Sequence, residues 1–156
     1  MESGNEKTTG ELNNILGSTH TEDFSDYLES NENCLLPEKK AFGKYYKDIL
    51  KTKGLQLRDV FLQADISEGY GYKLISEERR TRQRDVILRL CYAGMFTVNE
   101  TQKALRVYRM PELYSRDRRD ALLIIAFRDR PGSVIEINQL LKKNGLDPLR
   151  TSGMQD

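Results

Sequence analysis

The stretch QLRDVFLQADISEGYGYKLISE, residues 56–77, decides the fold that we predict for this chain. It contains two short helical patterns, Leu57–Ala64 and 68–76, separated by the turn Asp65–Ile66–Ser67. Two short helices joined by a turn of three or four residues are typical of a helix-turn-helix. We expect Asp65 to adopt the left-handed backbone conformation, because Asp is among the few residues besides Gly that tolerate it.

Phe61 and Gly71 stand where the two predicted helices should cross. Such motifs usually have a small residue on the first helix and Val or Ile on the second, so the sizes are reversed here. We expect the Phe61 ring to fill the space that Gly71 leaves open. On this interpretation a Phe61→Ala change should leave a cavity that costs about 3–5 kcal/mol.

Apolar residues at helical spacing predict further helices on both sides of this stretch. The expected helices are a short segment between Thr8 and Gly17, and residues 22–29, 38–53, 83–93, 98–108, 116–127 and 134–143. No segment has the alternating pattern of a strand. The sequence therefore predicts an all-α protein.

Capping residues predict where several of these helices begin and end. We expect Thr21 and Ser115 to cap the helices that follow them, and Gly145 to end the last helix. Two Ser/Thr-x-x-Glu pairs have the spacing of a capping box, in which each side chain binds the other residue's backbone N–H. These pairs are Thr97 with Glu100 and Ser133 with Glu136.

Charge divides the chain into an acidic leader and a basic body. Residues 1–40 carry nine acidic and three basic residues, a net charge of −6, whereas residues 41–156 have a net charge of +7. This asymmetry indicates a nucleic-acid or partner-binding protein; two ordinary solvated surfaces are the alternative. We predict an acidic N-terminal arm over 1–37, a helix-turn-helix domain over 38–110, a C-terminal helical pair packed on the same core over 111–149, and a tail over 150–156.

Several classes of protein are disfavoured by what the sequence lacks. No apolar run approaches the roughly 18 residues needed to span a bilayer, and residues 1–10 lack the apolar core of a signal peptide. Cys34 and Cys91 have no metal-ligand or disulfide spacing, which favours reduced thiols in a cytoplasm. The only histidine, His20, belongs to no catalytic motif, so we expect no enzyme, no metal and no cofactor.

Several motifs along the chain carry a resemblance to a known family. They are DYLESNE (26–32), YGYK (70–73), RD (84–85), ETQKAL (100–105), ELYSRDRRD (112–120), EINQLL (136–141) and GLDPL (145–149). Residues 38–93 resemble the Cro/C1-type (XRE-like) helix-turn-helix family. Residues 8–149 are similar to a subgroup of this family that is found in Gram-positive anaerobes. The resemblance implies a five-helix repressor-like domain, an added C-terminal helical pair, and a role as a transcriptional regulator.

The chain departs from this family after its second central helix. The family usually continues with Ser-Gly-Lys-Arg and a Pro, whereas this chain has Ser76–Glu77–Glu78–Arg79–Arg80 and one extra residue before Arg84. A Gly would let the backbone approach a DNA phosphate, but Glu77 and Glu78 place negative charges there. This substitution weakens the expectation of ordinary DNA docking.

The resemblance implies that the second central helix enters the major groove of double-stranded DNA. Only Lys73 there is a strong donor to base edges, and Tyr70 and Tyr72 could instead pack against a neighbouring helix. We expect the following arginines to hold phosphates, with a solvated loop as the alternative. The predicted DNA-contacting residues are Glu68, Tyr70, Tyr72, Lys73, Ser76, Arg79, Arg80, Arg82 and Arg84.

The C-terminal helices suggest contacts of other kinds. The cluster Arg116–Asp117–Arg118–Arg119–Asp120 favours an ion-pair network or a subunit contact over nucleic acid. Residues 122–127 are apolar all round, so their helix should be either the centre of the domain or half buried in a partner. A homodimer through the last two helices is one hypothesis.

Two functional hypotheses follow from the sequence. The first is a DNA-binding transcriptional regulator whose basic connector clamps phosphates. The second is a helical protein–protein interaction module, an adaptor or antitoxin-like partner, that kept the fold without sequence-specific DNA recognition. The acidic arm is compatible with both, because it could dock a protein or compete with DNA for the basic body.

Overall fold

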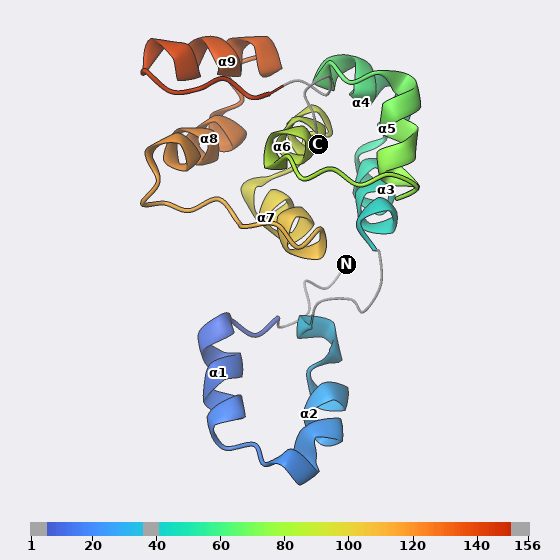
Figure 1. The fold of residues 1–156 in the computed structure, drawn as a ribbon, viewed down its shortest axis with the longest axis vertical. Coiled ribbons are helices and arrows are strands. Elements are labelled where there is room, and N and C mark those ends of the chain that lie inside the picture. The colour runs from blue at the N-terminus through green and yellow to red at the C-terminus, as the bar shows by residue number, and fades with distance from the viewer. Residues whose placement is uncertain (1–5, 36–40, 151–156) are drawn as a thin grey trace. The chain divides into compact units, whose positions relative to one another are not determined.

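The computed structural model describes residues 6–35 and 41–150 of the chain (Figure 1). These residues form helices, turns and irregular segments without a strand, which confirms the predicted all-α class. The chain divides into two compact units, Met1–Glu38 and Lys39–Asp156. Each unit is described by itself.

The described residues of the first unit, 6–35, include two α-helices, α1 (Thr9–Gly17) and α2 (Phe24–Ser30). Thr8 caps α1 in a capping box with Glu11. Our prediction of a helix over 22–29 capped by Thr21 is wrong in its details. Thr21–Asp23 is instead a 3-10 turn, and α2 begins at Phe24 without a side-chain cap.

The interior of this first unit is small. Tyr27 and Asn31 are its only buried residues among those described, and Leu16, Phe24 and Leu28 are exposed. A unit as short as Met1–Glu38 rarely buries enough apolar surface to be stable alone. Leu12, Ile15 and Leu35 are half-buried, so this unit has little fully buried apolar surface among its described residues.

The second unit consists of seven described helices around a continuous apolar core. They are α3 (Phe42–Lys53), α4 (Leu57–Ala64), α5 (Glu68–Ile75), α6 (Arg84–Ala93), α7 (Val98–Val107), α8 (Arg118–Asp129) and α9 (Val134–Lys143). Helices α4 and α9 and the turn 65–67 have the predicted bounds. Helices α5, α6 and α7 each differ from prediction by one residue at one end, and α8 differs by two residues at both ends. Helix α3 ends at Lys53 as predicted but begins at Phe42, because Ala41 is its non-helical N-cap; residues 38–40 of the predicted start lie outside the described residues.

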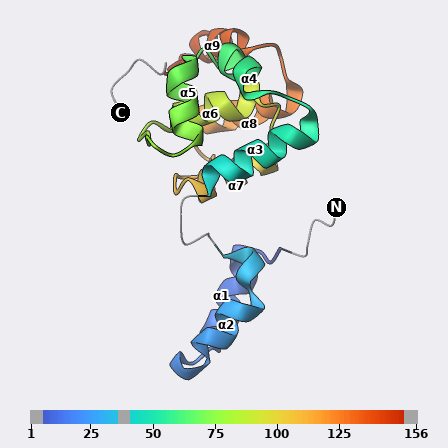
Figure 2. The ribbon, with the colours of Figure 1, turned by 90° about the vertical axis from the view of Figure 1, so that its right-hand side faces the viewer.

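Helix α6 forms the centre of this unit (Figure 2). Its residues from Val86 to Tyr92 are all buried, and it contacts α4, α7 and α9. From the sequence, we expect the helix around 122–127 to be either the centre of the domain or half buried in a partner. That helix, α8, buries Leu123 and Phe127 but leaves Ile125 45% exposed, so it lies at the edge of the core.

Aromatic rings and one glycine bring α3 against the rest of the core. The Tyr46 hydroxyl donates a hydrogen bond to the Leu90 carbonyl of α6 at 2.6 Å, and its ring stacks on Phe96. A Cβ added to Gly43 would lie 1.8 Å from the Ile75 carbonyl oxygen. Only glycine therefore allows α3 to approach the end of α5 this closely.

The capping predictions for α7 and α9 are confirmed, whereas that for α8 is wrong. Both predicted capping boxes, at Thr97 and at Ser133, are present. Helix α8 is not capped by Ser115, because it begins at Arg118 and Asp117 accepts the Asp120 N–H. A carboxylate two residues later thus takes the capping role, and the helix extends to Asp129 rather than Phe127.

Left-handed residues other than glycine follow five helices of this unit. Asp65 has φ +56°, as predicted, and ends α4. The other four are Glu77, Met95, Arg109 and Arg130. Glu77 belongs to the connector between α5 and α6 that carries the predicted arginine clamp, and Arg109 lies beside that connector.

Candidate nucleic-acid interface

Complementary shapes hold α4 and α5 together. Phe61 is 1% exposed, and a Cβ added to Gly71 would lie 2.7 Å from three atoms of its ring. The predicted exchange of sizes between Phe61 and Gly71 is therefore confirmed. Because this contact is apolar and central, the polar side chains of α5 need not take part in the packing.

The outer side of α5 presents most of the predicted contact residues. Glu68, Tyr72, Lys73 and Ser76 are exposed, and Tyr70 is half-buried. The Tyr72 ring nevertheless meets Phe61 edge-on, with centroids 5.1 Å apart. The alternative that the tyrosines pack against a neighbouring helix therefore applies to Tyr72, whose ring meets Phe61 of α4, while Tyr70 is partly buried against the core.

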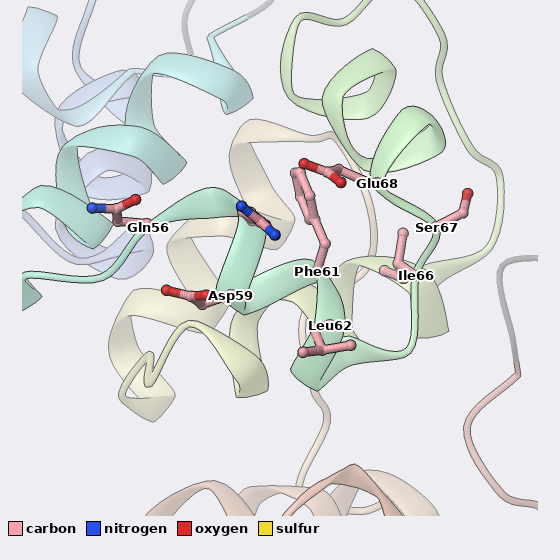
Figure 3. A pocket seen from close by; sticks show the side chains of 8 residues that line it. Gln56, Asp59, Phe61, Leu62, Ile66, Ser67 and Glu68 are labelled. Atoms are coloured by element: carbon pink, nitrogen blue, oxygen red, sulfur yellow. The ribbon is translucent and has the colours of Figure 1, made fainter.

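A hollow of about 550 Å³ lies between α4 and α5 (Figure 3). Asp59 and Glu68 line it together with Arg58, so its lining is not basic overall. Leu62, which also lines it, is 77% exposed. The full lining is Gln56, Arg58, Asp59, Phe61, Leu62, Ile66, Ser67 and Glu68.

Glu77 turns inward at the position where the family pattern has a glycine. It has φ +58° and is 7% exposed, and its carboxylate pairs with Arg80 at 3.1 Å. Arg80 also donates to the Tyr108 carbonyl at 3.0 Å and lies over the Tyr108 ring at 4.1 Å. The negative charge of Glu77 is thus balanced within the protein, and part of Arg80 is committed to holding the connector against α7.

Arg84 is committed to a contact between α6 and α8. Its guanidinium binds both carboxylate oxygens of Asp120, at 2.5 and 3.1 Å, and donates to the carbonyls of Pro111 and Glu112. Beside it, Arg119 binds both carboxylate oxygens of Asp85 at 3.0 Å. Arg119 and Asp120 of the predicted cluster do form ion pairs, but their partners are Asp85 and Arg84 of α6 rather than cluster residues three or four positions away.

Besides the exposed Arg80, which pairs with Glu77, three cationic side chains near the end of α5 face solvent: Lys73, Arg79 and Arg82. None of them has an ion pair with a residue that the structure describes. Arg79 lies over the Tyr70 ring at 5.3 Å, which orients its guanidinium without neutralising it. Of the four predicted clamp arginines, Arg79 and Arg82 are therefore available to a ligand, whereas Arg84 is not.

Arg89 is a structural residue that the sequence analysis missed. It is 3% exposed and donates to the carbonyls of Ala64, Leu149 and Arg150. Burial lowers its pKa, and the charges of Asp65 and Asp85 partly offset that effect. Because Ala64 precedes the turn, Arg89 fixes the end of α4 and so positions α5. Its only signal in the sequence is a charged residue within the apolar run of α6.

The described residues hold no cluster of His, Cys, Asp and Glu able to bind a metal ion. Across the described ranges, no helix has the length and apolar character needed to cross a membrane. A scan against protein-family models finds no match, and neither do searches of curated proteins and of solved structures. The resemblance to the Cro/C1-type family therefore stays a prediction.

Proposed function

We propose that the second unit binds double-stranded DNA as a transcriptional regulator, with α4 and α5 acting as a helix-turn-helix and α5 entering the major groove. The observation that supports this is the separation of roles on α5. Its inner side packs through Gly71, while Lys73 and the following Arg79 and Arg82 stay exposed without ion pairs to the described residues.

The side chains of α5 suggest how such a complex would divide its contacts. Lys73 can donate to guanine, and the Glu68 carboxylate can accept from the amino group of cytosine. Arg79 and Arg82 suit phosphates. Because α5 has no Arg, Asn or Gln for bidentate base recognition, we propose binding that depends on phosphates and salt more than on sequence.

A mobility-shift series on mixed-sequence duplex DNA at several salt concentrations tests this proposal. We expect binding that weakens steeply with salt, and a Lys73→Ala/Arg79→Ala variant should lose affinity and salt dependence. Arg118→Gln, which removes an exposed cation from α8, is the control and should bind like the parent. Absence of salt-dependent binding by the parent protein would overturn the proposal.

The hollow between α4 and α5 favours a second candidate, a protein–protein interaction module. Its lining joins the exposed Leu62 to the carboxylates of Asp59 and Glu68, a combination that suits a protein better than a phosphate backbone. A Leu62→Lys substitution separates the two functions. It adds a cation that should maintain or raise DNA affinity, whereas it should weaken a protein complex that buries Leu62.

Two further partners stay predictions. If the acidic arm competes with DNA for the basic body, removal of residues 1–37 should tighten DNA binding. If the arm instead docks a protein, its exposed Phe24 (56% exposed) is available for that contact. A homodimer through α8 and α9 would bury Ile125 and Ile135, which are 45% and 67% exposed. Sedimentation at tens of micromolar tests the dimer, and a monomer there would exclude it.

A further inference from the structure

Helix α8 lies at the edge of the second unit, and four of its residues form a straight stripe on the side that faces away from the core (Figure 1). We call them the α8 stripe: Arg118, Leu122, Ile125 and Asp129. Their spacing places them within about 60° of one another around the helix axis. Leu122 is half-buried, Ile125 is 45% exposed, and the two charged residues are exposed. The same alternation of four and three residues marks the contact side of helices that pair in coiled coils.

The two charges of the stripe oppose the dipole of their own helix. Arg118 is the first residue of α8, where the dipole favours an anion, and Asp129 is the last, where it favours a cation. Arg118 makes no ion pair with any residue that the structure describes. Asp129 pairs with its neighbour Arg128 at 3.0 Å, and both side chains are more than half exposed. Because such exposed pairs contribute little, contacts within the chain do not account for either charge.

The stripe is complementary to itself in one orientation. The pair Arg118 and Asp129 and the pair Leu122 and Ile125 are both centred midway between residues 123 and 124. A second α8 laid antiparallel across the stripe would therefore bring Arg118 opposite Asp129, and Leu122 opposite Ile125, in both directions. A two-fold axis between two identical chains requires reciprocal contacts of this kind.

We propose that α8 pairs with α8 of a second copy of this chain, antiparallel and through the α8 stripe, to form a homodimer. The apolar residues meet at the centre, and opposite charges meet at both ends. Each charge then lies near the end of the other helix that its dipole favours. A parallel pair is disfavoured, because it would bring Arg118 against Arg118 and Asp129 against Asp129. The proposal goes beyond the DNA binding proposed above, does not depend on it, and defines the contact of the homodimer considered there.

Charge reversal at each end of the stripe tests the pairing. Arg118→Asp and Asp129→Arg each place like charges opposite one another twice in a dimer, so each should weaken dimerisation about ten-fold or more. The double variant Arg118→Asp/Asp129→Arg exchanges the charges and should restore the dimer. Neutralisation alone, as in Arg118→Gln, should have little effect, because it removes an exposed attraction without adding a repulsion.

The single reversals should not harm folding. Each gives α8 a charge that the helix dipole favours at that end, so thermal denaturation should show unchanged or slightly higher stability. Lys44→Asp is the matched control. It reverses an exposed cation in the first turn of α3, outside the stripe, and should dimerise like the parent.

Sedimentation equilibrium of the full chain without DNA measures the association. One pair of helices makes a small interface, so we expect a weak dimer and measure it at tens of micromolar. The parent, Lys44→Asp and the double variant should form a dimer that each single reversal and Ile125→Asp weaken.

Three results would overturn the proposal. The first is a monomeric parent, and the second is a double variant that associates no better than the single reversals. The third is a dimer that is lost in Ile135→Asp but not in Ile125→Asp, because the contact would then lie on α9. Since no DNA is present, each of these results is independent of the mobility-shift test of the proposed function.

Discussion

Two helix junctions of the second unit are closed by different forces. The α4–α5 junction is closed by shape, because the Phe61 ring occupies the space above Gly71. The α6–α8 junction is closed by charge, since Arg84 and Asp85 of α6 bind Asp120 and Arg119 of α8. Because the α4–α5 junction needs no charged residues, those near it stay available for a ligand, whereas the charged residues at the α6–α8 junction are already paired.

Phe61→Ala should break the shape-based junction and have the largest effect on stability. Removing a buried ring leaves a cavity beneath α5, and we expect the free energy of unfolding to fall by about 3–5 kcal/mol. Urea denaturation measures the change. Leu62→Ala, one residue away and 77% exposed, is the matched control and should stay within about 0.5 kcal/mol of the parent. A nearly neutral Phe61→Ala would contradict the described packing.

Gly71→Ala approaches the same junction from the other helix. The added methyl would lie 2.7 Å from the Phe61 ring, so we expect overpacking to cost about 1–3 kcal/mol. The smaller side chain of a Phe61→Leu change should relieve this clash. In denaturation experiments the double variant should therefore be more stable than the sum of the two single effects predicts. Strict additivity would show that the two sites do not interact.

Asp120→Asn should weaken the charge-based junction while preserving the shape of the side chain. Arg84 then loses its carboxylate partner in a mostly buried position, and we expect a loss of about 1–3 kcal/mol. Glu112→Gln is a matched control, because the Arg106–Glu112 pair is about 40% exposed on both sides and should contribute little. Equal effects of the two substitutions on urea denaturation would contradict the distinction.

Acid should affect the charged contacts and leave the Phe61/Gly71 packing intact. Burial by itself would raise the pKa of Glu100, but hydrogen bonds from Thr97 and the charge of Lys53 together lower it. A lowered pKa in the folded state stabilises the protein above the unfolded-state value of about 4.5, and that contribution disappears as the pH falls through the folded value.

Comparison of Glu100→Gln with the parent between pH 6 and pH 3 measures this contribution. We expect the variant to be less stable at pH 6, by about 1 kcal/mol or less for a lost capping interaction, and the difference to shrink toward pH 3. A difference that grows on acidification would have the wrong sign for a carboxylate that is stabilised in its charged form.

Local interactions explain what the sequence could predict. The capping boxes at Thr97 and Ser133 join residues three positions apart, and Asp65 ends its helix through its own backbone preference. The positions of Phe61 and Gly71 in the helix-turn-helix pattern also identified them as facing residues across a three-residue turn. In each case the interacting groups are close in sequence, so the physical cause lies within the segment itself.

The start of α8 shows where local patterns mislead. Ser115 has an acceptable capping side chain, but Asp117 takes that role. Tyr114 meanwhile donates its N–H to the side chain of Asp120, which also binds Arg84 from α6. The position of the helix end therefore depends on a partner 36 residues away in the chain, which no local pattern contains.

Whether interacting residues are near or distant in the chain separates what the sequence alone determined from what only the tertiary structure decided. Composition and periodicity determined an all-α chain, the bounds of α4, and a connector rich in arginine. The tertiary structure decided which arginines are already engaged: Arg80 with Glu77 and Tyr108, and Arg84 with Asp120. The sequence does not reveal which residue a charged side chain pairs with, because the partner comes from a segment that is distant in the chain. In the folded structure Arg79 and Arg82 have no such partner among the described residues and face solvent.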